Sequence, residues 1–437
     1  MQRPGHHFFA LLLAVVLPPQ VVRAADLLTL YRSAVYDNPL LKVRQIGVDK
    51  ARADADLADS RLYPQISVQT SASRNDYKDT ASESRYNGQR TIWSARQAIL
   101  DLPSVYRRDG ARSVIRQTEK EADQARAELF AQIVDHYFNA LQADDELMQL
   151  QSEKEAAQKQ VDRLRAMRER EMAKVTDLVE AISWLQQLNT REIDAANKGE
   201  AARARLRELS GREPGVLALL IRSEFPPVPE SVDYWVNAAQ TTNPAIIARR
   251  EALEASKQTA DAAHAEHWPQ LSLSLQRNQS NQDIDNSPRR EFTVDSVSLE
   301  LRFPIYEGGR ASAGEASARA QQAIAREQLD GLLREVERDT RVIYASAVAD
   351  RARIDSTNAE VDALTQTVRA QERGYELGVA TVINVLDARR RLLRSRVDQS
   401  KARYDYLRDL IGLKIRAGLL AEAEVAEFNR WLGPRDQ

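Results

Sequence analysis

One pattern occurs twice in this chain, and this internal repeat limits its possible folds more than any other feature. Asn243-Pro244 repeats Asn38-Pro39, and Trp268-Pro-Gln-Leu-Ser-Leu273 repeats Tyr63-Pro-Gln-Ile-Ser-Val68, each at a shift of 205 residues. Self-similarity at a fixed spacing indicates a duplicated structural unit. The sequence therefore predicts two copies of one unit, in residues 25–212 and 231–416.

Most of each copy has the spacing of long helices. Apolar or small residues recur at alternating steps of three and four, which is typical of a coiled-coil seam. In the first copy the seam is Leu129, Ile133, His136, Ala140, Ala143, Leu147, Leu150, Lys154, Ala157, Val161 and Leu164. In the second it is Leu329, Leu333, Val336, Thr340, Ile343, Ala347, Asp350, Ile354, Thr357, Val361, Leu364 and Val368.

Each copy also contains a break between two helical segments. The clearer break is Gly374-Tyr-Glu-Leu-Gly-Val-Ala-Thr381, whose glycines accept the backbone angles that end a helix. Thr381 is placed to cap the returning helix. A weaker copy begins at Arg170, and there Thr176 and Asp177 could act as a cap. The sequence therefore predicts two helical hairpins.

The lengths of the helical segments are also matched. A helix over residues 103–170 would be roughly 100 Å long at about 1.5 Å per residue. Residues 26–61 and 176–210 would each give about half of that length, and the second copy repeats the arrangement. Two short helices stacked end to end beside one long helix would make a uniform two-helix rod.

Four short segments alternate at a period of two, as strands do. They cover residues 63–73, 91–102, 268–277 and 292–303, with polar loops expected over 74–90 and 278–290. Four strands cannot close a barrel alone, whereas three chains would supply twelve strands and leave no free edge. The alternative is a soluble β-sandwich at the end of a coiled coil.

Composition and the N-terminus point to export. Residues 1–24 have Arg3 ahead of an apolar core and a small-residue site before Ala25, which predicts a cleavable signal peptide. Charged residues make up 29% of the chain, its net charge is -2, and it has no cysteine. This balance excludes a basic field for nucleic acid and any thiolate metal site or disulfide. Residues 213–230 and 417–437 lie outside the rods, and we expect them to form a small equatorial belt around the middle.

No motif for catalysis or cofactor binding stands out. His264 and His267 form the only close histidine pair after the predicted signal peptide, and no third ligand lies near them in the sequence, although a metal site needs three or four. Nucleophile elbows, phosphate loops and dinucleotide fingerprints are absent from the sequence. We therefore expect no cofactor, no metal and no enzymatic activity.

Together, the signal peptide, the doubled Asn-Pro and aromatic-Pro-Gln motifs, the Pro304–Gly309 strand end and the Gly-Val-Ala-Thr tip resemble the TolC family of outer-membrane channels. The resemblance covers nearly the whole mature chain. It implies a mainly α fold with a small β part, in which duplicated coiled-coil hairpins form a tunnel and four strands per chain join a trimeric, twelve-stranded transmembrane β-barrel.

The resemblance also implies partners and a location. A homotrimer in outer-membrane lipid would dock a periplasmic membrane-fusion adaptor and an inner-membrane RND or ABC transporter. It would serve as the exit duct of a tripartite efflux pump or a type I secretion system in a Gram-negative bacterium. The competing interpretation is an exported coiled-coil scaffold of the cell envelope that conducts nothing; a periplasmic adaptor would need a further β-rich domain.

Site residues follow from the same resemblance. It implies a periplasmic gate made of Tyr375, Thr176, Asp177, Asp387 and Asn384. Adaptor docking is expected at the two tips, at Met172, Ala173, Lys174, Gly378, Val379, Ala380 and Thr381. The chain departs from the family pattern in two gate positions, because Ala380 replaces a gating arginine and Asn384 replaces a ring aspartate. Glu171 stands where the first tip would have glycine, which predicts a strained or altered turn.

Overall fold

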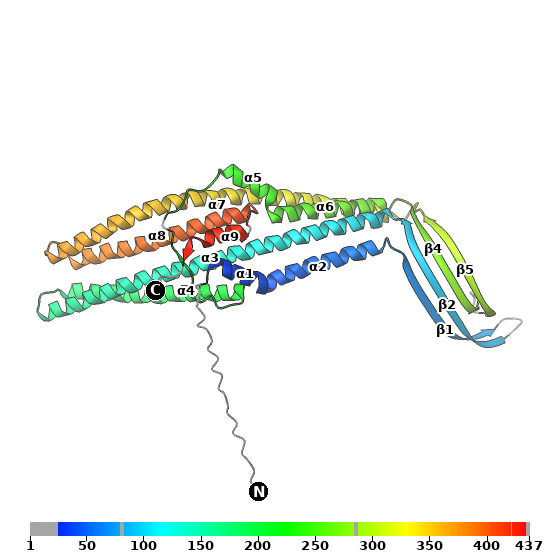
Figure 1. Cartoon of the computed structure of the whole chain (residues 1–437), viewed down its shortest axis with the longest axis horizontal. Helices are drawn as coiled ribbons and strands as arrows, with labels where there is room; N and C mark the ends of the chain where they lie inside the picture. The colour runs from blue at the N-terminus through cyan, green and yellow to red at the C-terminus, as the bar shows by residue number, and fades with distance from the viewer. Residues whose placement is uncertain (1–24, 79–82, 223, 284–286, 421, 434–437) are drawn as a thin grey trace, which may run out of the picture.

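The computed structural model describes residues 25–78, 83–222, 224–283, 287–420 and 422–433, so the predicted signal peptide at 1–24 lies outside the described residues. A long helical body carries a four-stranded sheet that bends away at one end (Figure 1). The helices are α1 (Leu27–Asp37), α2 (Pro39–Ser60), α3 (Leu102–Glu169), α4 (Val175–Ser210), α5 (Val232–Thr242), α6 (Pro244–Ala265), α7 (Arg310–Glu376), α8 (Val382–Arg416) and α9 (Glu422–Asn429). The strands are β1 (Gln65–Lys78), β2 (Glu83–Leu100), β3 (Leu219–Leu220), β4 (Gln270–Gln282), β5 (Pro288–Arg302) and β6 (Leu432–Gly433).

The two long helices, α3 and α7, are accompanied by shorter ones as the lengths predicted. Helices α2 and α4 pack on α3, and α6 and α8 pack on α7. The seam positions given above are all buried or half-buried, which confirms the seven-residue pattern. In the described part of the chain no helix has the length and apolar character needed to cross a membrane.

The repeated Asn-Pro motif is the joint between stacked helices. Asn38 caps α2 by accepting from Leu40 N at 2.9 Å, while its side-chain amide donates to Leu209 O near the end of α4 at 3.2 Å. Asn243 does the same for α6 and α8, accepting from Ala245 N at 2.9 Å and donating to Arg416 O at 2.8 Å. One asparagine thus satisfies a free donor of one helix and a free carbonyl of the next.

The sheet is antiparallel, with the order β1-β2-β4-β5, and its strands extend further than predicted. The first predicted loop is wrong, because residues 74–78 pair with 83–87, ending at Lys78 opposite Glu83. The second is also too long, since β4 continues to Gln282 and β5 already starts at Pro288. In these extensions both faces are polar, so the alternation that marks a half-buried strand is missing from the sequence.

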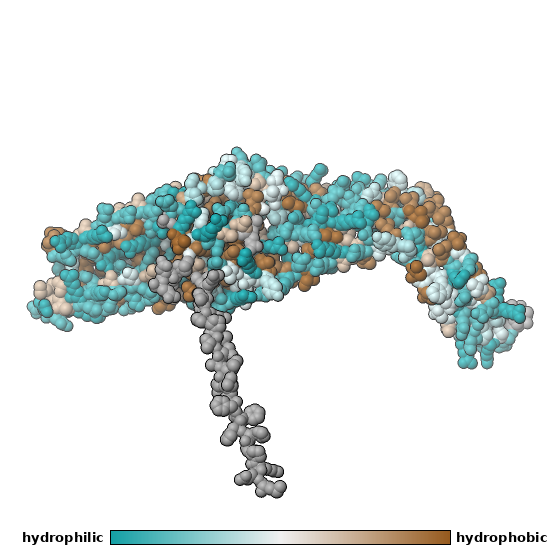
Figure 2. Space-filling model, viewed as in Figure 1, coloured by the Kyte–Doolittle hydropathy of each residue, from teal (hydrophilic) through white to brown (hydrophobic). Residues whose placement is uncertain are grey.

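Nearer the helices the sheet has one apolar face and one polar face. The cross-strand pairs place these apolar residues on one side: Ile66, Val68, Trp93, Leu271, Leu273, Leu275, Val297, Leu299 and Leu301. The other side carries Ser67, Gln69, Ser94, Ser272, Ser274, Gln276, Ser296 and Ser298. In Figure 2 the apolar surface gathers where the sheet meets the helices, and the far end is hydrophilic.

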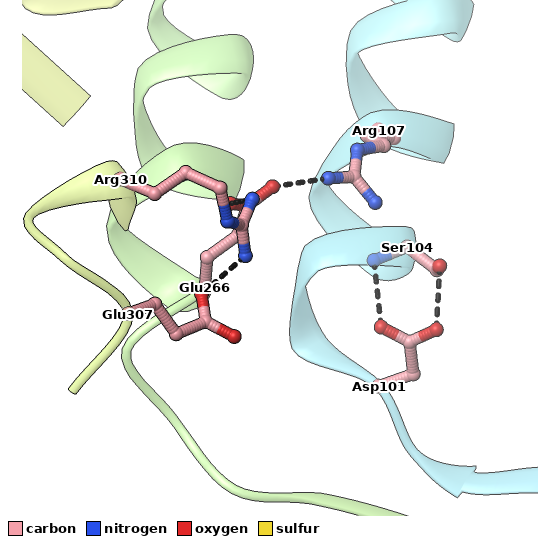
Figure 3. Close-up of polar contacts among 6 residues, drawn as sticks. All are labelled: Asp101, Ser104, Arg107, Glu266, Glu307 and Arg310. Atoms are coloured by element: carbon pink, nitrogen blue, oxygen red, sulfur yellow. Dashed lines mark hydrogen bonds and ion pairs between the residues drawn. The ribbon is translucent and has the colours of Figure 1, made fainter. Parts of the chain in front are cut away.

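Polar contacts fix the start of the long helices at this junction (Figure 3). Asp101 caps α3, accepting from Ser104 N at 3.1 Å and from Ser104 Oγ at 2.6 Å. Glu266, at the end of α6, pairs with Arg107 of α3 at 2.7 Å and with Arg310 of α7 at 3.4 Å. These contacts tie three helices together beside the sheet.

The segments outside the rods meet at the middle of the helical body. Strand β3 pairs with β6, and Phe225, Val425 and Phe428 are buried in the large core cluster. Tyr406 of α8 donates to Pro226 O at 2.6 Å, which anchors the connection between the two repeats. Residues 217–228 and 422–433 therefore pack around the middle of the rods.

Candidate functional site

The two helical tips lie at the end of the body opposite to the sheet (Figure 1). Both turns have the same hydrogen bonds: Glu171 N donates to Arg168 O and Met172 N to Met167 O, as Gly378 N does to Tyr375 O and Val379 N to Gly374 O. This is the two-bond arrangement that closes helices through one left-handed residue.

Glu171 is that left-handed residue in the first tip. Its φ is 58°, against 76° for Gly378 in the second tip. The turn therefore keeps its shape, and the predicted strain falls on a side chain that is poorly suited to this conformation.

The two returning helices begin differently. Thr381 caps α8 as predicted, because its hydroxyl accepts from Asn384 N at 3.3 Å and also bonds the Asn384 side chain. Helix α4 starts at Val175, and its N-cap residue Lys174 makes no capping hydrogen bond with its side chain. The alternative that Thr176 and Asp177 form the cap is therefore wrong. Asp177 lies in the first turn, where a negative charge favours the helix dipole.

Tyr375 joins the two hairpins. It packs against a cluster that contains Trp184 and Leu188 of α4 and Val382 of α8. Burial raises the pKa of the Tyr375 hydroxyl; Arg163 opposes this shift, and the nearby charge of Asp177 adds to it. Among the described residues the hydroxyl makes no hydrogen bond to Thr176 or Asp177. The structure thus brings Tyr375 and Asp177 near each other, while Thr176 is exposed.

Asp387 is exposed and forms an ion pair with Arg390 at 3.3 Å, one turn further along α8. The pairing offsets part of the carboxylate charge. Asn384 is part of the cap of α8, because its backbone N–H and its side chain both bond the Thr381 hydroxyl. Of the two expected gate residues on α8, one is therefore partly neutralised by an arginine and the other belongs to the helix cap.

Sequence reasoning missed two arginines that connect the hairpins. Arg390 of α8 pairs with Glu180 of α4 at 2.7 Å, and its guanidinium lies 5.1 Å from the centre of the Trp184 ring. Arg389 contacts Glu372 of α7 at 3.0 Å and Glu153 of α3 at 3.5 Å. Both residues sit in a run of three arginines on a highly charged helix, so no signal in the sequence distinguishes them.

A further connection lies between the helical tips and the middle of the body. Asp145 of α3 accepts from Tyr404 Oη at 2.8 Å and from Ser400 Oγ at 3.0 Å, both on α8. Burial raises the pKa of the Asp145 carboxyl, and the hydrogen bonds from Tyr404 and Ser400 oppose that shift. The hairpins are therefore connected at successive levels along their length.

The predicted docking residues differ in accessibility. Met172 and Val379 are 68% and 83% exposed, so both tips present apolar side chains to solvent. Ala173 instead packs against the cluster between the hairpins. Ala380 folds back against Gly374, so closely that a Cβ added to Gly374 would lie 3.1 Å from the Ala380 Cβ. Lys174, Gly378 and Thr381 are exposed.

The histidine pair lies beside Glu315, a residue about 50 positions further along the chain. His264 Nδ1 lies 3.1 Å from Glu315 Oε1, and His267 Nε2 lies 3.4 Å from Glu315 Oε2. Arg319 already pairs with this carboxylate at 2.6 Å. In the described part of the chain no group of histidine or acidic side chains is placed to hold a metal ion.

Comparisons with known proteins agree with this architecture. The family model for outer membrane efflux proteins matches two segments of the chain, residues 30–212 and 235–418. The outer membrane protein TolC of Vibrio cholerae is 26% identical over 416 residues, covering 94% of each chain. The alkaline protease secretion protein AprF of Pseudomonas aeruginosa is 25% identical, covering 82% of this chain and 75% of that one.

A solved structure shows the same fold. The Campylobacter jejuni CmeC outer membrane channel superposes with a TM-score of 0.81 at 17% identity, covering 92% of this chain and 89% of that one. Because the family model spans most of the sequence in both repeats, the chain is a member of the outer membrane efflux protein family.

Proposed function

We propose that this chain is the outer-membrane exit duct of a tripartite efflux pump or a type I secretion system. The observation that carries the proposal is the sheet with one apolar and one polar face, joined to a helical body built on helices of 68 and 67 residues. A membrane admits strands only when they are closed into a barrel. The apolar face would then meet lipid, and the polar face would line the duct.

The barrel would be completed by three copies of the chain. Strands β1 and β5 are the edges of the sheet, with 14 and 15 residues, and an open edge of that length favours pairing with another chain. Three four-stranded sheets would close into twelve strands, an even number as in other outer-membrane barrels.

The tips would form the closed periplasmic entrance. Tyr375, at the end of α7, packs against the apolar cluster between the hairpins and has Asp177 near it. Asn384 and Asp387 lie close to the start of α8, which is the helix that follows. Thr176, which precedes Asp177 in the chain, is exposed. Arg389 and Arg390 supply ion pairs between hairpins in a chain that has Ala380 in place of the gating arginine of the family.

The exposed apolar tips would dock a periplasmic adaptor, which would connect the duct to an inner-membrane RND or ABC transporter. Met172 and Val379 are suited to such a contact because they are large, apolar and exposed. The matching family is named for efflux, and one relative is named for secretion of an alkaline protease, so both efflux and type I secretion fit.

Membrane association and ion conduction test this function. The mature chain should remain in the outer-membrane pellet after an alkaline carbonate wash, and the purified protein should form ion-conducting pores in planar lipid bilayers. Release into the carbonate supernatant would overturn the channel and favour a periplasmic coiled-coil scaffold.

A further inference from the structure

The last residues of β4 leave the plane of the sheet at its far end. The pairing of β4 with β5 shifts between Ser280 and Gln282. There Ser280 Oγ donates to Gln282 O at 2.7 Å and accepts from Gln282 N at 3.1 Å. A serine whose hydroxyl bonds the backbone two residues further along the chain in this way bends the strand locally.

The bend carries Gln282 across β2 to reach β1. Gln282 is 5% exposed, and its Oε1 accepts from Ser73 Oγ at 3.2 Å and from Asn75 Nδ2 at 3.0 Å. Both donors belong to β1, although β2 lies between β1 and β4. Gly88 of β2 makes the crossing possible, because a Cβ at that position would lie 2.0 Å from Gln282 Oε1.

The neighbouring residues hold the crossing segment in place. Asn281 uses its side chain where the backbone would otherwise pair with β2, accepting from Gln89 N at 2.6 Å and donating to Asn87 O at 2.9 Å. Arg90 of β2 donates to Asp283 O at 3.0 Å. The crossing is therefore attached to β2 and β1 at several points.

The crossing lies on the polar face of the sheet. Ser73 pairs with Gly88 in the register that also pairs Ser67 with Ser94. Because side chains alternate strictly along a strand, these positions share one face. That face is the one opposite to Ile66 and Trp93.

We propose that residues 280–283 form a second constriction, at the extracellular mouth of the duct, with Gln282 as the residue that holds it inward. This inference rests on the proposed function, because the polar face lines a lumen only in a closed barrel. Three copies of the crossing would narrow the mouth and limit the size of what passes, independently of the periplasmic tips.

Accessibility of an inward-facing thiol tests the constriction without depending on the periplasmic gate. The chain has no cysteine, so Ser274→Cys on the polar face gives a single reactive site. In intact cells a small, membrane-impermeant maleimide should label it quickly, and a large polyethylene glycol maleimide should label it slowly. Adding Gln282→Ala should speed up the large reagent selectively. The matched control Gln279→Ala, on the other face of β4, should leave both rates unchanged.

A second route guards against misfolding of the Gln282 variant. The double variant Ser73→Ala, Asn75→Ala removes the two donors without altering β4, and it should speed up the large reagent in the same way. Equal rates for the large reagent in all variants that reach the outer membrane would overturn the constriction. Failure of the small reagent to label Ser274→Cys in cells would instead overturn the channel itself.

Discussion

Glu171 destabilises the turn of the first tip, whereas Gly378, its counterpart in the second tip, does not. A left-handed conformation costs a non-glycine residue about 1–2 kcal/mol, and Glu171 adopts it with a φ of 58°. We predict that Glu171→Gly slows amide hydrogen exchange in the first tip, over residues 167–175. The reverse change, Gly378→Glu, should speed up exchange in the second tip. An unchanged rate in both variants would mean that the turns carry no strain.

The arginines of α8 lead to a prediction about leakage. Replacing Arg390 with alanine removes its ion pair to Glu180 and its contact with the Trp184 ring. Partly exposed pairs contribute up to about 1 kcal/mol, which corresponds to roughly a five-fold rise in the open fraction. Sensitivity to antibiotics that the outer membrane normally excludes should therefore increase, and more so when Arg389→Ala is added.

The control for this prediction is Arg394→Ala. Arg394 is on the same helix, but its side chain is 85% exposed, and its ion pair, at 3.9 Å, is with Asp398 of α8 itself. Charge or glycine changes at Tyr375 and Asp177 should also raise leakage. Equal antibiotic sensitivity in the Arg390, Tyr375 and control variants would contradict the gate assignment.

At the scale of elements, the seam between α7 and α8 has a built-in dependence on pH. Asp409 is half-buried, and burial raises its pKa to about 6, with Asp350 and Asp405 adding to the shift and Arg408 opposing it. Because this pKa lies above that of the unfolded chain, protonated Asp409 favours the folded state. This contribution to the free energy of unfolding is complete below about pH 4 and is lost as the pH rises through 6. Asp409→Asn should raise the free energy of unfolding at pH 7.5 by about 1 kcal/mol, after allowance for solvent screening.

Chemical unfolding of the detergent-solubilised protein at pH 5 and pH 7.5 measures this effect. The variant should gain more stability at pH 7.5 than at pH 5. Asp398→Asn, an exposed change on the same helix, should alter neither value. A gain of equal size at both pH values would show that Asp409 is not the titrating group.

The elements also show how far sequence reasoning extends. Helix spacing and the Thr381 cap could be predicted because local chemistry determines them. The Asn-Pro motifs could be recognised only as a repeat, because their bonds to the ends of α4 and α8 join residues far apart in the sequence. The far ends of the strands could not, because neither face there is apolar. The ties through Arg389, Arg390 and Asp145 were also beyond reach, since they join residues more than 200 positions apart in a sequence rich in charge.

At the scale of the whole molecule, the proposed duct depends on three chains closing one barrel. The four-stranded sheet leaves β1 and β5 as edges, and its apolar face has exposed side chains such as Leu299 and Val297. A single chain can neither pair its two edge strands with each other nor cover its apolar face. Closure around a three-fold axis would pair both edges and place the apolar face in lipid.

The mass of the protein particle in detergent, measured by light scattering with the detergent contribution subtracted, tests this claim most directly. We predict a mass three times that of the mature chain. A particle with the mass of one or two chains would contradict it, because neither four nor eight strands from these sheets would give the twelve-stranded duct.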